Sequence, residues 1–94
     1  MIGDRSLPDD ALPYAKTSIF TAETVPSKLT NTHNTKKGIW GRLNVNRGEV
    51  SYYLDGEDAP LAAIRAGETL IIQPEEWHFV RLNEDAEFFV EFYK

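Results

Sequence analysis

The chain has 94 residues, a length that fits one domain with a single modest hydrophobic core. Its net charge is −5 at pH 7, and no nucleic-acid partner is expected because an acidic surface repels phosphate backbones. Cysteine is absent, which excludes disulfides, thiol catalysis and zinc–thiolate sites. No apolar run approaches the roughly 20 residues that span a bilayer, and the N-terminus lacks the features of a signal peptide. We therefore expect a cytoplasmic protein with no membrane partner.

Residues 1–13 are acidic and broken by proline, and they are predicted to form a flexible lead-in. Residues 14–94 are predicted to form one β-domain, because short runs rich in β-branched and aromatic residues alternate with turn residues. The expected strands are residues 14–22, 25–34, 39–45, 49–55, 60–66, 69–73, 77–83 and 87–94. This regular spacing predicts an all-β sandwich or barrel. A helical turn competes with a strand only at residues 60–68.

The last run, EFFVEFYK at residues 87–94, is apolar, aromatic and prone to form a strand. An open edge of this composition would promote aggregation. We therefore expect this strand to be paired inside the barrel or buried at the interface of a homodimer.

The two histidines, His33 and His78, lie in the stretches HNTKKGIWGRLNV and PEEWH. Side chains alternate between the two faces of a strand. His78 has the parity of Val80 and Leu82 in its predicted strand, and His33 has the parity of Leu29. If both strands are regular, both imidazoles point toward the apolar interior, although one β-bulge would reverse this orientation.

Two inward-facing imidazoles could supply two ligands of a zinc, nickel or iron centre, since neutral imidazole is the commonest protein ligand for such metals. A stable zinc site takes three or four protein ligands. Glu76 is the candidate for the third, with Glu75 and Gln73 as alternatives. In a simpler interpretation, His78 is a partly buried histidine bonded to the backbone, and His33 belongs to a turn.

Aromatic side chains beside the histidine motifs indicate a ligand-binding pocket. Trp40 and Trp77 each adjoin a motif that carries a histidine, so we expect them near the mouth of a pocket, with Tyr52 as a further aromatic contact. The alternative is that most of the aromatic residues pack in the core and pair across strands.

A small basic group stands out in this acidic chain. Arg42 is the main candidate for binding an oxyanion or a carboxylate, because arginine pairs with such groups through two parallel hydrogen bonds. Lys36, Lys37 and Arg47 complete the group. The alternative interpretation is a solvated turn.

The stretch GETLIIQPEEWH at residues 67–78 resembles the second motif of the cupin superfamily, in which a glycine turn, a strand, a proline and a histidine follow one another. Together with HNTKKGIWGRLNV and EFFVEFYK, it is similar to the N-terminal domain of the TehB-type tellurite-resistance proteins and their stand-alone relatives of the YeaR type. This resemblance implies a small single-domain cupin-like jelly-roll β-barrel over residues 14–94, often dimeric. It does not extend to a methyltransferase domain, since no glycine-rich nucleotide-binding loop is present.

The resemblance also shows a reduced set of metal ligands. Metal-binding cupins place two histidines and a glutamate in the first motif and one histidine in the second. Here His33 lies near the first position and His78 matches the second motif, whereas residues 35–37 replace the other histidine. Trp40 or Gly41 stands near the glutamate position. About half of the expected ligands are therefore missing.

Three hypotheses for function follow from these patterns. The first is a binding or regulatory module that holds a small molecule, an oxyanion or a metal and is associated with tellurite resistance, as the resemblance implies. The second is a small metal-dependent enzyme that uses His33, His78 and one carboxylate. The third is a purely structural dimerisation barrel.

Overall fold

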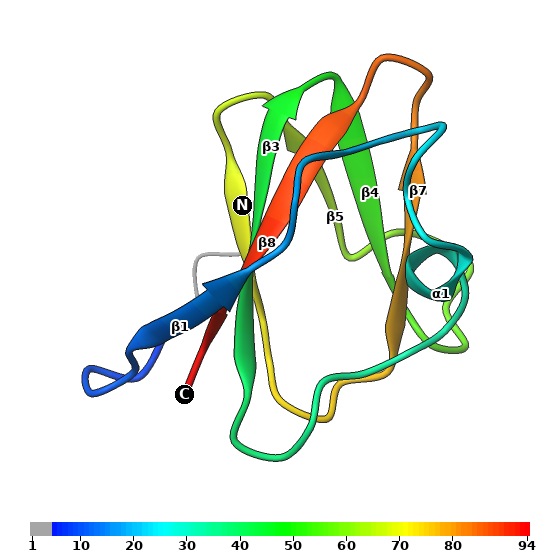
Figure 1. Cartoon of the computed structure of the whole chain (residues 1–94). Helices are drawn as coiled ribbons and strands as arrows, with labels where there is room; N and C mark the ends of the chain where they lie inside the picture. The colour runs from blue at the N-terminus through cyan, green and yellow to red at the C-terminus, as the bar shows by residue number, and fades with distance from the viewer. Residues whose placement is uncertain (1–4) are drawn as a thin grey trace.

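The computed structural model describes residues 5–94, and nearly all regular structure in this range is β (Figure 1). The elements in chain order are β1 (Pro13–Lys16), β2 (Phe20–Thr21), α1 (Ser27–Thr30), β3 (Trp40–Arg47), β4 (Glu49–Leu54), β5 (Ala62–Arg65), β6 (Thr69–Ile72), β7 (His78–Leu82) and β8 (Glu87–Tyr93). The prediction of an all-β domain is confirmed. Across residues 5–94, no helix has the length and apolar character that crossing a membrane requires.

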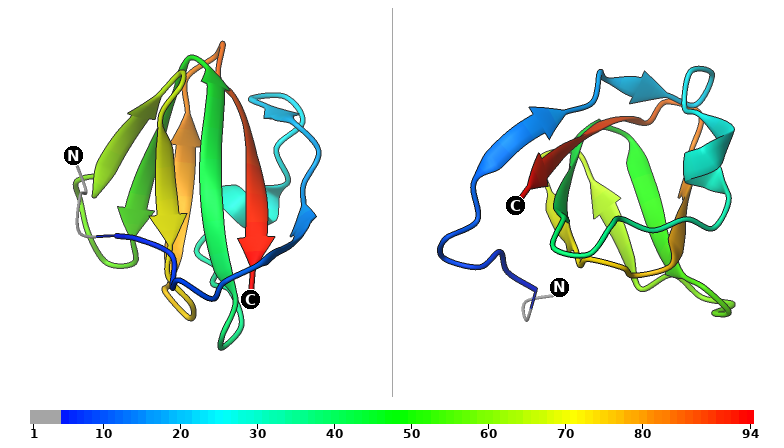
Figure 2. Two further views of the ribbon diagram at one scale, coloured as in Figure 1. Left: turned by 90° about the vertical axis from the view of Figure 1, so that its left-hand side faces the viewer. Right: turned by 60° about the horizontal axis from the view of Figure 1, so that its bottom comes forward.

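The strands form two antiparallel sheets that enclose an interior (Figure 2). One sheet has the order β1-β8-β3-β6, with β2 also paired to β8, and the other has the order β5-β4-β7. From β3 onward the chain crosses to the other sheet after every strand except β4, as in a jelly roll, and among the described strands only β4 and β5 are neighbours both in sequence and in one sheet. The predicted cupin-like jelly roll is confirmed.

The core follows the alternation of side chains along β3, β4 and β8. Leu43 and Val45 of β3 and Val50 and Tyr52 of β4 are almost completely buried, as their shared parity predicts. From β8, which pairs with β3, Phe88 is one of the largest fully buried side chains. The C-terminal run is the strand between β1 and β3, so the expectation that it is paired inside the barrel is confirmed.

Two predicted strands were wrong in detail. Residues 14–22 split into β1 and β2, and the predicted strand at 25–34 is instead the helical turn α1 followed by a loop. Pro26 precedes this turn, where its fixed φ is compatible with a helix start, and its carbonyl accepts a hydrogen bond from the Leu29 N–H. The segment at 60–66, where a helix competed, does contain a strand, β5.

The predicted lead-in has contacts with the barrel from Arg5 onward. Leu12 and Lys94 exchange two backbone hydrogen bonds of 3.0 and 3.1 Å, which place residue 12 beside the end of β8. Residues 1–4 of the lead-in lie outside the described residues. The flexibility predicted for residues 1–13 stays a prediction.

Replacing Gly48 with alanine is expected to destabilise the domain far more than replacing Gly56. Both glycines have positive φ, 68° and 82°, a conformation that costs a residue with a side chain roughly 1–2 kcal/mol. A Cβ at position 48 would lie 2.8 Å from the backbone of Ala86, whereas one at position 56 would meet nothing within 4 Å. Urea unfolding should therefore show a loss of about 3 kcal/mol for Gly48→Ala and about 1 kcal/mol for Gly56→Ala. Equal losses of stability in the two variants would contradict the close approach of the β3–β4 turn to Ala86.

Candidate functional site

A cavity of about 490 Å³ opens into the interior of the barrel. Its apolar wall comes from both sheets, with Leu43, Ile72, Val80 and Phe88 among the lining side chains, and the segment from β1 through α1 to Ile39 closes one side. The polar side chains on the wall are Thr17, Lys28, His33, Asn34, Thr35, Lys36 and His78. Within the described residues, no aspartate or glutamate lines this cavity. A mostly apolar concave surface with a few polar groups is typical of a small-molecule site.

The backbone brings the two histidines together. His33 and His78 form an isolated antiparallel bridge, in which each N–H donates to the carbonyl of the other at 2.9 Å. The centroids of the two imidazole rings lie 4.3 Å apart, and both rings line the cavity. The structure thus places both residues at the interior, although His33 lies in a loop and not in the strand from which this orientation was predicted.

Both imidazoles bond the backbone through Nδ1. The Nδ1 atom of His33 lies 2.9 Å from the Asn31 carbonyl oxygen, and that of His78 lies 2.7 Å from the Glu76 carbonyl oxygen. A carbonyl oxygen only accepts, so Nδ1 carries the proton and Nε2 of the neutral ring is left with a lone pair. Burial lowers the pKa of His78 to about 4, so this ring is neutral at pH 7.

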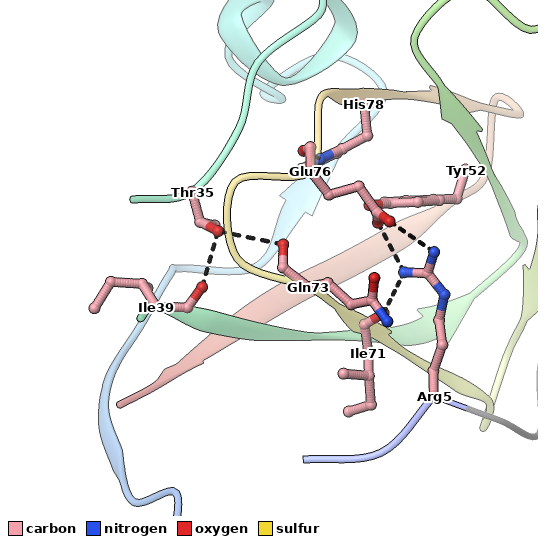
Figure 3. A network of polar contacts seen from close by, with 8 residues as sticks. All are labelled: Arg5, Thr35, Ile39, Tyr52, Ile71, Gln73, Glu76 and His78. Carbon is pink, nitrogen blue, oxygen red and sulfur yellow. Dashed lines mark hydrogen bonds and ion pairs between the residues drawn. The ribbon is translucent and has the colours of Figure 1, made fainter. Parts of the chain in front are cut away.

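A buried polar network lies behind His78 (Figure 3). The Glu76 carboxylate accepts two hydrogen bonds of 2.7 Å from Arg5 and one of 2.6 Å from the Tyr52 hydroxyl. The Tyr52 ring also stacks on the His78 imidazole, with centroids 4.8 Å apart. Burial opposes ionisation of Glu76, but the hydrogen bonds from Arg5 and Tyr52 outweigh it and hold the pKa of the carboxyl below its usual value. Burial raises the pKa of Tyr52, so its hydroxyl keeps the proton that it donates.

The residues around the two histidines do not form a complete metal site. Among residues 5–94, no group of three histidine, cysteine, aspartate or glutamate side chains is close enough to hold an ion. Glu76, the expected third ligand, directs its carboxylate to Arg5 and Tyr52. Two imidazoles fall short of the three or four protein ligands of a stable zinc site. Metal binding by His33 and His78 stays a prediction.

The four residues predicted to bind a ligand do not line the cavity. Tyr52 lies behind His78, and Trp77 is 54% exposed. Trp40 and Arg42 belong to β3, where Arg42 alternates with Leu43 and therefore faces away from the cavity. The cavity thus differs from the pocket that these four aromatic and basic residues indicated.

The basic group predicted from the sequence is also dispersed. Arg42 donates to the Tyr93 hydroxyl at 2.7 Å, and Arg47 lies 3.7 Å from the Glu87 carboxylate. Lys36 lines the cavity, and Lys37 does not. Lys28, which the sequence did not single out, lines the cavity as well because α1 stands where a strand was expected. Pro26, directly before α1, was the signal for a helix start.

The fold and the cavity define a small cupin-like jelly-roll domain, and the comparisons with known proteins agree. The TehB-like domain family matches residues 15–90, so the chain belongs to this family. It is 31% identical over 90 residues to the probable S-adenosyl-L-methionine-dependent methyltransferase TehB of Haemophilus influenzae (strain 10810), a match that covers 90% of this chain and 32% of TehB. It is also 27% identical over 96 residues to YeaR of Escherichia coli (strain K12), covering 93% of this chain and 81% of YeaR.

Solved structures give the same result. The crystal structure of a protein from E. coli (strain K12) matches with a TM-score of 0.82 and 26% identity, covering 96% of both chains. That of TehB from H. influenzae matches with a TM-score of 0.77 and 27% identity, covering 90% of this chain and 32% of TehB. The chain thus spans about a third of the length of TehB and is homologous to the N-terminal part of that protein.

The neutral His78 predicts a loss of stability in mild acid. Its pKa is about 4 in the fold and 6.5 when unperturbed, so between these values the unfolded chain binds more protons than the folded chain. Stability therefore falls as the pH is lowered through this window, and by pH 4.5 the buried ring alone costs about 2–3 kcal/mol. Urea unfolding at pH 7 and pH 4.5 should show this extra loss for the wild type relative to His78→Gln. Equal losses in both proteins would contradict a buried neutral ring.

Proposed function

We propose that the domain is a binding module for a small organic anion with an apolar body. The observation that supports this proposal most directly is the charge of the cavity wall. The whole chain has 15 acidic and 10 basic residues, yet both charged side chains on the wall are lysines, Lys28 and Lys36. An anionic group near these lysines gains Coulomb energy, while the apolar body covers the rest of the wall.

The two histidines add a requirement on the ligand. With Nδ1 of each ring donating to a carbonyl, Nε2 is a hydrogen-bond acceptor, and no described residue donates to it. A ligand with a hydroxyl or similar donor at one end and an anionic group at the other would satisfy both the imidazoles and the lysines. A hydroxy-substituted aromatic carboxylate is the simplest molecule with these properties.

The family resemblance connects the domain with tellurite, and we propose a regulatory or binding role in such a response. A compact, strongly hydrated oxyanion would leave most of the apolar wall uncovered, so an organic anion suits this cavity better. TehB is named as a probable methyltransferase, and this domain matches about a third of its length. The function proposed for this domain does not include methyl transfer.

The lysine pair offers a matched test of the proposal. Titration of the full chain with benzoate, followed by two-dimensional NMR, is expected to give saturable shifts, whereas neutral benzamide binds more weakly. Lys36→Glu should raise the Kd of benzoate about tenfold because it reverses a charge on the wall. The neighbouring Lys37→Glu is the control, since Lys37 is also exposed but does not line the cavity. Equal effects of the two substitutions, or saturable binding of tellurite in place of benzoate, would contradict an organic anion at this wall.

A metal-binding function is the second candidate, and the adjacent imidazoles with free Nε2 atoms favour it. With two protein ligands, we expect tag-free protein to contain zinc, nickel or iron well below one ion per chain by elemental mass spectrometry. Any bound ion should be lost in both His33→Ala and His78→Ala. Near-stoichiometric metal that disappears in both variants would instead support the metal-dependent enzyme.

A further inference from the structure

Arg5 attaches the N-terminal segment to the turn between β6 and β7. Its guanidinium forms a two-point ion pair with Glu76 and also donates to the Ile71 carbonyl at 3.1 Å. Only 11% of the Arg5 side chain and 14% of the Glu76 side chain are exposed. Removing two charges from water is costly unless their geometry is well satisfied, so this contact differs from an ordinary surface salt bridge.

Glu76 connects this ion pair to the cavity. Its side chain accepts hydrogen bonds from Arg5 and Tyr52, while its backbone carbonyl accepts the Nδ1 proton of His78 (Figure 3). The Tyr52 ring packs against the same imidazole. Contacts that hold the Glu76 side chain therefore also restrain the carbonyl on which the His78 tautomer depends.

The turn needs such restraint because Glu75 has a φ of 62°, in the left-handed region that residues with a side chain disfavour. On one side, the Glu75 N–H donates to the Thr35 carbonyl at 3.1 Å. On the other side, Arg5 holds the next residue, Glu76. Loss of the Arg5 contact would free the turn to leave this conformation and to move the Glu76 carbonyl away from His78.

We infer that Arg5 is a positioning residue for the cavity: by holding Glu76, it fixes the His78 ring with Nδ1 as donor and Nε2 as acceptor. The segment before β1 is then a functional part of the site, although Arg5 does not line the cavity. The consequence for ligand binding rests on the proposed function, whereas the consequence for the His78 tautomer does not.

The test is the tautomer of His78 in the ligand-free full chain, measured by long-range ¹H–¹⁵N NMR of the imidazoles at pH 7 in the presence of EDTA. The wild type should show a protonated Nδ1 and an unprotonated Nε2, with widely separated ¹⁵N shifts. In Arg5→Ala the two shifts should move toward each other, because both tautomers become populated. Arg65→Ala is the control, since Arg65 forms an exposed ion pair with Glu49. It should leave the His78 shifts unchanged.

Unchanged His78 shifts in folded Arg5→Ala would overturn the inference, even if that variant is less stable. If Arg5→Ala does not fold, Tyr52→Phe decides the question, because it removes one donor to Glu76 and keeps the ring against His78. Its shifts should move in the same direction by a smaller amount, and an unchanged tautomer would again overturn the inference.

A binding measurement separates this inference from the proposed function. Wild-type protein should prefer 4-hydroxybenzoate over benzoate, because the extra hydroxyl can donate to Nε2. Arg5→Ala should reduce this preference by about threefold to tenfold, the value of one hydrogen bond. If neither probe binds the wild type, the proposed function fails and the tautomer experiment still decides the role of Arg5. If the preference persists in Arg5→Ala with an unchanged tautomer, the inference fails and the binding function stands.

Discussion

The backbone bridge between His33 and His78 is the contact on which the cavity depends. The β7 strand pairs with β4 on one side, and on the other side its backbone bonds, among the described residues, to His33 alone. Two further hydrogen bonds flank this bridge, from Arg81 to the Thr30 carbonyl and from the Glu75 N–H to the Thr35 carbonyl. The loop after α1 therefore occupies the place of a further strand, and its side chains complete the wall of the cavity.

Polar groups are buried behind an apolar cavity at a cost in desolvation, and the structure satisfies them through mutual contacts. Arg5 compensates the charge of Glu76, the Tyr52 hydroxyl completes the network, and the Glu76 carbonyl accepts from His78. Such networks contribute little net stability but hold their members in one arrangement when every member is satisfied. A neutral ring held in a single tautomer presents one defined acceptor to the cavity.

The comparisons place the same domain in two contexts. Its sequence accounts for most of YeaR and for about a third of TehB. A domain that serves as most of one protein and as one part of another suits a self-contained module with its own core. The buried residues of both sheets form one such core here, and Leu43, Val80 and Phe88 of that core also line the cavity.

The sequence by itself predicted the all-β class, because strand alternation and glycine turns are local properties of the chain, and its resemblance to the TehB-type family predicted the jelly roll. Leu43 and Val50 were predictable as core residues for this reason. The helical turn at α1 was missed because a run of four residues is too short for its apolar residues to show a helical period. Only the tertiary structure decided that Lys28 faces the cavity, that Arg42 faces away from it, and that Arg5 holds Glu76. The Arg5–Glu76 contact joins residues 71 positions apart, and no local pattern specifies an ion pair that forms only after the sheets have packed.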